Sequence, residues 1–204
     1  MISYSQNKED SIIAGYYQNR KGTLLDLGAN DGITISNSRR FLLDGWTGVL
    51  VEPSKEAYGR LQNNCTDMPV TLLDVAVGEK CEEVEFMESG VHFKNGNDVG
   101  LLSTLSDDDY NKWKDTTDWK RYKVRVVDVA TLFALAGKST FDFVSIDIEG
   151  MDLFVLQQMD LTAMGVSCIC VEHNGKDIEK YINHCTKHGL KELHRNQENI
   201  ILVK

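Results

Sequence analysis

The chain of 204 residues has only two prolines, an odd number of cysteines and no long apolar run. Without proline-rich, repetitive or low-complexity stretches, nothing marks a linker, so we expect one domain over residues 1–204. The five cysteines lack C-x-x-C spacing, which argues against a disulfide framework and a zinc ribbon. No apolar stretch approaches a membrane span, and residues 1–10 lack the parts of a secretory signal. We therefore expect a cytoplasmic protein.

The chain also lacks an excess of positive charge. Its 31 acidic side chains outweigh 22 basic ones and leave a formal net charge of -9. Such a surface repels nucleic-acid phosphates and anionic membranes, so the sequence predicts neither as a partner. One basic concentration, in residues 112–125, has aspartates interleaved with it and is typical of a solvated face. Nothing in the sequence indicates an oligomeric state.

Apolar strands alternate with helical segments, which is the pattern of an α/β fold with a doubly wound, mostly parallel sheet. Core strands are expected at residues 23–28, 48–52, 70–74, 141–146 and 166–173. Helices are expected at residues 33–45, 54–64, 129–136, 149–159 and 177–188. Partly alternating polarity predicts an extra antiparallel pair or edge at residues 82–86 and 123–127, and residues 190–194 and 199–203 predict a closing hairpin-like pair.

Residues 88–122 are too many for an ordinary connection in a compact domain, and connections of this length are usually covers of a site or disordered. More ring-bearing side chains occur here than a disordered linker would hold. They are His92, Phe93, Tyr110, Trp113 and Trp119. We expect an inserted, lid-like segment that covers a substrate, although a surface helix near residues 107–114 that simply packs on the domain explains the pattern equally well.

The most informative stretch is a buried strand that enters a tight turn, Leu24-Leu25-Asp26-Leu27-Gly28-Ala29-Asn30-Asp31-Gly32. Gly28 and Gly32 give the backbone freedom and leave room for a ligand to approach the main chain. Twenty residues after Gly32, a second apolar strand ends at Glu52, a carboxylate placed to accept hydrogen bonds from ribose hydroxyls. Together, the turn and the carboxylate predict a nucleoside-binding site.

The register of the glycines distinguishes between nucleoside ligands. A G-x-G-x-x-G dinucleotide motif needs glycines at positions 28, 30 and 33, where this chain has Gly28, Asn30 and Ile33. Because the middle glycine lets the backbone approach a pyrophosphate, a nicotinamide-dependent oxidoreductase is a weaker hypothesis. The observed D-x-G-x-x-x-G is closer to the first motif of S-adenosylmethionine-dependent methyltransferases, whose cofactor has no phosphate. A plain turn without a ligand is the structural alternative.

Most predicted core strands end in an acidic or polar side chain, and in an open α/β sheet these ends meet at one edge. The strand-end residues are Asp26, Gly28, Glu52, Asp74, Asp147, Glu149, Glu172 and His173. Clustered carboxylates repel one another unless a cation or hydrogen-bond donors lie nearby, so the pattern favours a ligand site. A sulfonium cofactor with an ammonium group would suit this field, and so would a divalent metal. Each residue alone can instead be structural, for example at a helix N-terminus.

Several segments resemble the FkbM family of S-adenosylmethionine-dependent methyltransferases. They are Ser5-Gln6-Asn7-Lys8-Glu9-Asp10, Asp26-Leu27-Gly28-Ala29-Asn30-Asp31-Gly32, Ser36-Asn37, Gly45-Trp46-Thr47-Gly48, Glu52-Pro53, Ala76-Val77-Gly78 and Ile146-Asp147-Ile148-Glu149-Gly150. The S-Q-x-x-E-D opening and the D-x-E-G element are the most distinctive. The resemblance implies a Rossmann-like class I methyltransferase fold with an antiparallel terminal strand. It also implies O-methylation of a hydroxyl on a sugar or related small metabolite.

For the cofactor S-adenosyl-L-methionine, we expect Glu52 to bind the ribose and Asp74 and Val75 to border the adenine. The turn at residues 28–32 should flank the methionyl part. By resemblance only, Gln6 reaches the same pocket. The full expected set for cofactor binding is Gln6, Asp26, Gly28, Ala29, Asn30, Gly32, Glu52, Pro53, Asp74 and Val75.

A sugar hydroxyl is a poor nucleophile, so a base should take its proton during in-line methyl transfer. His173 and Asp147 are equal candidates, the histidine because its ordinary pKa of about 6.5 suits the task. Glu149 completes the expected catalytic group. Asp147, Glu149 and His173 could instead hold a divalent metal, which we favour less than a metal-free site. The non-enzymatic alternative is a nucleoside-binding module that has lost turnover.

Overall fold

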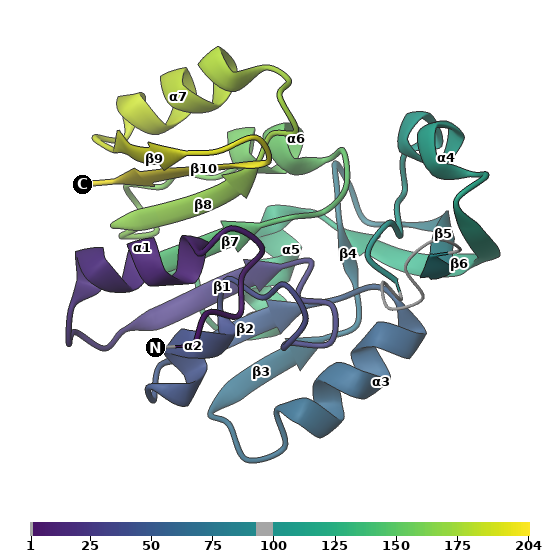
Figure 1. Ribbon diagram of the computed structural model, residues 1–204, viewed down its shortest axis with the longest axis horizontal. Coiled ribbons are helices and arrows are strands. Elements are labelled where there is room, and N and C mark those ends of the chain that lie inside the picture. Colours follow the sequence, from purple (N-terminus) through teal and green to yellow (C-terminus); the bar gives the residue numbers. More distant parts are fainter. Residues whose placement is uncertain (1, 93–99) are drawn as a thin grey trace.

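The computed structural model describes residues 2–92 and 100–204, and its centre is a mostly parallel sheet (Figure 1). Within the described chain, the strand order of this sheet is β3-β2-β1-β7-β8-β10-β9. The strands are β1 (Thr23–Leu27), β2 (Thr47–Val51), β3 (Val70–Leu73), β7 (Phe143–Ile146), β8 (Cys168–Glu172), β9 (Lys191–Arg195) and β10 (Asn199–Val203). All neighbours from β3 to β8 pair in parallel, whereas β10 is antiparallel to both β8 and β9. The predicted α/β class, with an antiparallel strand near the end of the sheet, is confirmed.

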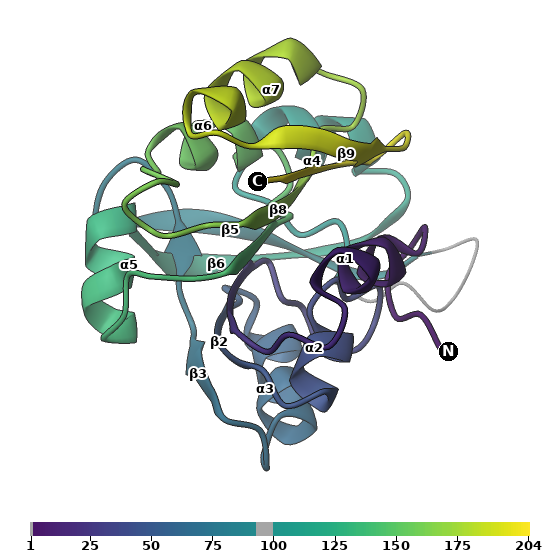
Figure 2. The same ribbon diagram turned by 90° about the vertical axis from the view of Figure 1, so that its left-hand side faces the viewer.

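Helices cover both faces of the main sheet, which places a hydrophobic core on each side (Figure 2). Helices α1 (Glu9–Tyr17), α2 (Arg39–Leu43) and α3 (Lys55–Asn64) pack on one face, and α5 (Val129–Ala136), α6 (Asp152–Gln157) and α7 (Ile178–Lys187) pack on the other. Because the central strands are buried on both faces, β1 is apolar apart from Asp26 and the threonine at its start. The sequence predicted this sheet from such runs.

Two predicted helices are shorter in the structure than the sequence pattern indicated. The helix expected at residues 33–45 is formed only by α2, because the serines before it bond to one another and to Asp26 in a series of turns. The helix expected at residues 149–159 begins at Asp152. Glu149 and Gly150 have left-handed backbone conformations, with φ of 49° and 97°, so they form a turn that a helix cannot continue.

Helix α1 was not predicted, and it carries the S-Q-x-x-E-D opening. The side chain of Glu9 is fully buried, and its Oε1 accepts hydrogen bonds from the amide groups of Asn196 (2.6 Å) and Asn199 (3.1 Å) in the β9–β10 hairpin. At the other end of α1, the Tyr17 hydroxyl donates to the carbonyl oxygen of Asp142, just before β7 (2.7 Å). The helix therefore fastens the first residues of the chain across the sheet to its last hairpin.

A second, smaller sheet lies on the side of the main sheet where the parallel strands end (Figure 1). It consists of β4 (Ala76–Val77), β6 (Thr117–Val127) and β5 (Glu82–His92), in the order β4-β6-β5. The predicted antiparallel pairing of residues 82–86 with 123–127 is confirmed, and it continues well into the segment expected as a lid. That segment also contains α4 (Asp107–Trp113). Phe93 and the other residues from 93 to 99 lie outside the described residues, and a lid role for 88–122 remains a prediction.

In the described parts of the chain, every helix is too short or too polar to cross a membrane. The five cysteines are all unpaired, and four of them are buried.

Candidate functional site

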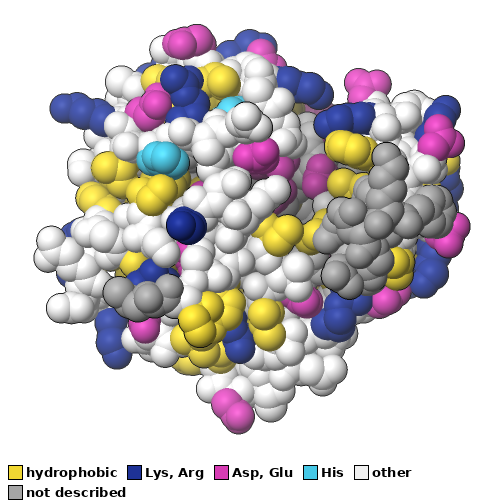
Figure 3. All heavy atoms as spheres, viewed as in Figure 1, with side chains coloured by type: hydrophobic (Ala, Val, Ile, Leu, Met, Phe, Trp, Pro, Cys, Tyr) yellow, Lys and Arg dark blue, Asp and Glu magenta, His cyan; other side chains and the backbone are white. Residues whose placement is uncertain are grey.

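A pocket opens where β1, β2 and β7 end, and Figure 3 shows acidic side chains gathered around a hollow in this part of the surface. The empty volume is about 680 Å³ with open solvent at the mouth included, which is in the range of small-molecule sites. Strand ends form one wall, and β5 with residues 100–105 forms the other. The lining residues are Leu27, Gly28, Asn30, Val51, Glu52, Pro53, Val75, Ala76, Val77, Phe86, Gly100, Leu101, Ser103, Thr104, Leu105, Asp147, Ile148, Glu149 and Met151.

The glycine turn brings the end of β1 against the end of β7. Gly28 has a φ of 83°, and a Cβ atom there would collide with the carbonyl oxygen of Asp147. Glycine is therefore required both by the backbone conformation and by the close approach of the two strands. Gly32 has a different task, because its missing Cβ makes room for Leu61 of α3. Gly32 packs the turn and does not line the pocket.

Glu52 directly follows β2, and its carboxylate is held by the backbone from two sides. Its Oε2 accepts a hydrogen bond from the Asn30 N–H, and its Oε1 accepts one from the Ser54 N–H, both at 2.8 Å. Burial raises the pKa of Glu52 to about 7, while the two N–H donors favour the charged form. A carboxylate has about four lone-pair sites, so Glu52 has a fixed orientation and capacity for further donors from a ligand.

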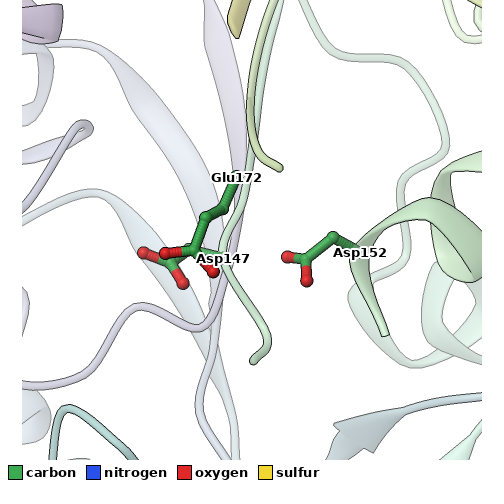
Figure 4. Close-up of side chains that lie close together, drawn as sticks. All are labelled: Asp147, Asp152 and Glu172. Carbon is green, nitrogen blue, oxygen red and sulfur yellow. The ribbon is translucent and has the colours of Figure 1, made fainter. Parts of the chain in front are cut away.

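Carboxylates from three elements converge beside the pocket (Figure 4). Asp147 follows β7, Asp152 begins α6 and Glu172 ends β8, and one oxygen of each lies within 4.8 Å of the others. Burial, together with the neighbouring carboxylates, raises the pKa of Asp147 to about 7 and that of Glu172 to about 11. Oxygen ligands of this kind suit hard cations such as magnesium or calcium, so this trio can hold a proton or a cation.

The D-x-E-G turn between β7 and α6 is clamped from both sides. The Asp152 carboxylate accepts hydrogen bonds from the N–H groups of Ile148 (2.9 Å) and Gly150 (3.1 Å). The Thr104 hydroxyl donates to the carbonyl oxygen of Glu149 (2.8 Å). A Cβ at Gly150 would collide with the Asp109 carboxylate. The side chain of Glu149 therefore reaches the pocket from a fixed backbone, and burial and Asp147 raise its pKa.

His173 does not line the pocket. It is only 4 % exposed, its Nδ1 accepts a hydrogen bond from the Gly175 N–H (2.8 Å), and burial lowers its pKa. Within the described residues, the carboxylate trio does not include His173 or Glu149, so the expected metal set of Asp147, Glu149 and His173 is not the set that the structure brings together. Adjacent residues at a strand end point to opposite faces, and it is Glu172 that points toward Asp147.

Half of the residues expected at the cofactor line the pocket. These are Gly28, Asn30, Glu52, Pro53 and Val75. The other expected residues have different surroundings. Gln6 and Asp74 are exposed, Ala29 is buried in the core, and Asp26 is buried with its carboxylate accepting a hydrogen bond from the Ser38 hydroxyl (2.5 Å).

The sequence did not single out individual residues on the far wall of the pocket, although residues 100–105 belong to the segment expected as a lid. Apolar contacts there come from Phe86, Leu101 and Leu105. Asp152 was also missed, because an aspartate in the first turn of a helix is common for electrostatic reasons alone.

The strand order, the antiparallel β10 and a pocket beyond the ends of β1 and β2 define a Rossmann-like class I methyltransferase fold. The model of the methyltransferase FkbM domain matches residues 26–189, and the chain belongs to this family.

Solved methyltransferase structures share the fold. Methyltransferase FkbM from Methylobacillus flagellatus is 13 % identical with a TM-score of 0.58, and the match covers 90 % of this chain and 44 % of that one. This chain therefore spans less than half the length of that protein. A methyltransferase from Geobacter sulfurreducens (8 % identical, TM-score 0.53, 99 % and 80 % covered) and a putative RNA methyltransferase from Pyrococcus horikoshii (14 %, 0.52, 96 % and 79 %) are also similar. No curated protein matches the chain.

Proposed function

We propose that the protein is an S-adenosylmethionine-dependent O-methyltransferase that acts on a hydroxyl of a sugar or related small metabolite. The observation that carries this proposal is the Glu52 carboxylate, held by the N–H groups of Asn30 and Ser54 at the wall of the pocket. A ribose presents two neighbouring hydroxyl donors, which suit a preoriented carboxylate. Membership of a methyltransferase family supports the same cofactor.

The rest of the pocket suits the other parts of this cofactor. Pro53, Val75 and Val77 offer an apolar slot for adenine. The turn from Gly28 to Asn30 offers backbone beside the methionyl part. A pyrophosphate is a poorer fit, because Asn30 with its side chain stands where a dinucleotide motif has glycine.

Methyl transfer in the proposed reaction forms a bond between the acceptor oxygen and the methyl carbon while the carbon–sulfur bond breaks. The electron pair of that bond stays on sulfur, and the hydroxyl proton passes to a base. We assign this role to Asp147, because it lines the pocket and its pKa, raised to about 7 by burial and nearby carboxylates, suits proton uptake near neutral pH. His173 is the weaker candidate because it does not line the pocket.

The proposed acceptor is small and uncharged or cationic, because the net charge of -9 and the acidic pocket edge disfavour nucleic acid, membrane lipid and other polyanions. The five unpaired thiols agree with a reducing compartment, so the proposed location is the cytoplasm.

Calorimetric titration with S-adenosylhomocysteine tests the cofactor. We expect micromolar binding, which corresponds to about -8 kcal/mol, and no binding of NAD under the same conditions. Binding of NAD alone would instead favour an oxidoreductase. Titrations with magnesium and with a chelator show whether the trio of Asp147, Asp152 and Glu172 holds a cation. Turnover is then measured over a panel of sugars and hydroxylated metabolites, and binding without any product would favour a module that has lost turnover.

A further inference from the structure

A buried hydrogen-bond chain joins Glu52 to the second sheet, and Glu88 is at its centre. Glu88 lies on β5 and is 5 % exposed. Its Oε1 accepts hydrogen bonds from the hydroxyl groups of Ser54 (2.5 Å) and Tyr122 (2.7 Å) and a longer one from the Glu56 N–H (3.5 Å). Ser54 in turn donates its backbone N–H to Glu52. One carboxylate oxygen on β5 therefore supports the residue that orients the pocket carboxylate.

Both hydroxyl groups have a fixed orientation, because each donates its single proton to Glu88 and accepts a hydrogen bond from a backbone N–H. The Ser54 oxygen accepts a hydrogen bond from the Ala57 N–H (3.0 Å) and so caps α3, while its proton goes to Glu88. The Tyr122 oxygen accepts one from the Lys55 N–H (3.0 Å), and its proton also goes to Glu88. The backbone just after β2 thus rests on the β5–β6 pair.

The neighbours of Glu88 on β5 hold the far wall of the pocket. Met87 exchanges two backbone hydrogen bonds with Thr104, each of 3.0 Å. The Ser89 hydroxyl accepts a hydrogen bond from the Leu102 N–H (3.1 Å). Thr104 then donates to the carbonyl oxygen of Glu149. Starting from Glu52, these contacts run around the pocket to the acidic turn on its other side.

We propose that Glu88 is a positioning residue that couples the cofactor pocket to the wall formed by residues 100–105, so that a nucleoside cofactor bound at Glu52 orders that wall. A buried carboxylate is costly unless hydrogen bonds compensate it, and here the two bonds from hydroxyl groups lead to the backbone that orients Glu52. The inference rests on the proposed function, because it takes the ligand of this pocket to be S-adenosylmethionine. If Glu88 serves only to hold the Ser54 cap of α3, its loss changes stability and leaves cofactor binding unchanged.

Titration calorimetry with S-adenosylhomocysteine tests the positioning role. We expect Glu88→Ala to raise the Kd about tenfold, since the two hydroxyl groups that hold the backbone at Ser54 and Lys55, next to Glu52, lose their common acceptor. Glu88→Gln keeps an acceptor oxygen for both hydroxyls, so its Kd should stay within about threefold of wild type. Glu83→Ala removes an exposed carboxylate from the same strand and is the matched control, with an unchanged Kd.

Hydrogen exchange at residues 100–105 tests the coupling. Saturating S-adenosylhomocysteine should slow exchange in the wild-type chain and in Glu83→Ala but not in Glu88→Ala. If Glu88→Ala does not fold, Tyr122→Phe removes one of the two hydroxyl donors to Glu88 and should give the same change to a smaller extent.

Wild-type affinity in Glu88→Ala, or binding by Glu88→Gln as weak as that of Glu88→Ala, would overturn the inference and leave the proposed function intact. An unchanged Kd in Tyr122→Phe would do the same where that variant replaces Glu88→Ala. If the folded wild-type chain does not bind S-adenosylhomocysteine, the proposed function is wrong and this inference fails with it.

Discussion

Glu52 and Asp147 follow the two strands that flank β1, and burial raises the pKa of each to about 7, yet their surroundings differ. Each oxygen of Glu52 accepts a backbone N–H, so the carboxylate has one orientation. Asp147 instead lies among other carboxylates, whose charges add to the effect of burial. The role of an acid at a strand end therefore depends on the hydrogen-bond donors and charges around it and not on its position alone.

This difference assigns the two acids different tasks in the proposed reaction. Glu52 can accept hydrogen bonds from a ligand without rearranging, which suits binding. Asp147 gains when a proton or a cation relieves the repulsion from its neighbours, which suits proton transfer. Variants at each position should consequently affect different measured quantities.

The largest effect is expected for Asp147→Asn. This change keeps the shape of the side chain but removes the base, so turnover should fall about 10²- to 10⁴-fold. Affinity for S-adenosylhomocysteine should change by less than about threefold. Steady-state kinetics and calorimetry check the two quantities, and Asp67→Asn, at an exposed site far from the pocket, is the control. Turnover close to wild type would show that Asp147 is not the base.

Glu52→Ala should have the reverse pattern. We expect the affinity for S-adenosylhomocysteine to fall by about 1–3 kcal/mol, roughly 5- to 150-fold, because charge-assisted hydrogen bonds to the ribose are lost. Turnover at saturating cofactor should decline much less. Calorimetry measures the affinity, with Glu79→Ala at an exposed site as the control. Unchanged affinity would mean that Glu52 has only a structural role.

The pH dependence of stability sharpens the comparison further. The folded-state pKa of Glu52 is raised to about 7 from an ordinary value of 4.5. The stabilisation from its protonated form is therefore fully present below about pH 4.5 and is lost as the pH rises through about 7. The free energy of unfolding, measured with urea from about pH 5 to 7.5, should fall less steeply in Glu52→Gln than in wild type. Equal slopes would contradict the raised pKa.

The smallest effect on turnover is expected for His173→Ala. Because His173 lies outside the pocket, turnover should stay within about threefold of wild type, although the loss of a buried side chain should lower the melting temperature. Kinetics under cofactor saturation and thermal unfolding separate the two effects. A loss as large as that of Asp147→Asn would return the role of the base to His173.

The main sheet could be predicted from the sequence because its strands are short apolar runs, buried on both faces, with acids at their ends. Helix α1 could not, because Glu9 and Asp10 look like surface residues although both are fully buried. Their partners lie near the other end of the chain or depend on a local turn, and neither is visible as a spacing. The second sheet extends further than expected. Many residues of β6 are exposed, so the alternation of polar and apolar residues along it is too weak to show its full length in the sequence.

The candidate site could be predicted only in part, since the direction of a side chain is not readable from a strand end. Glu52, Asp147 and Glu149 line the pocket as expected, whereas His173 does not. His173 was expected at the end of its strand, but β8 ends at Glu172, and it is the Glu172 carboxylate that lies beside Asp147. The turn at Glu149 and Gly150 likewise depends on Thr104 and Asp109, which are distant in sequence.

The attachment of α1 to the β9–β10 hairpin also bears on how far the chain can be shortened. The family match stops at residue 189 and begins within β1, at residue 26. A chain trimmed to those limits would lose α1 and both strands of the hairpin. Without β10, the edge of the buried strand β8 would lose its pairing and be exposed to water. The segment that matches the family is therefore shorter than the segment that forms the fold. Shortened versions of the chain should keep α1 and the β9–β10 hairpin.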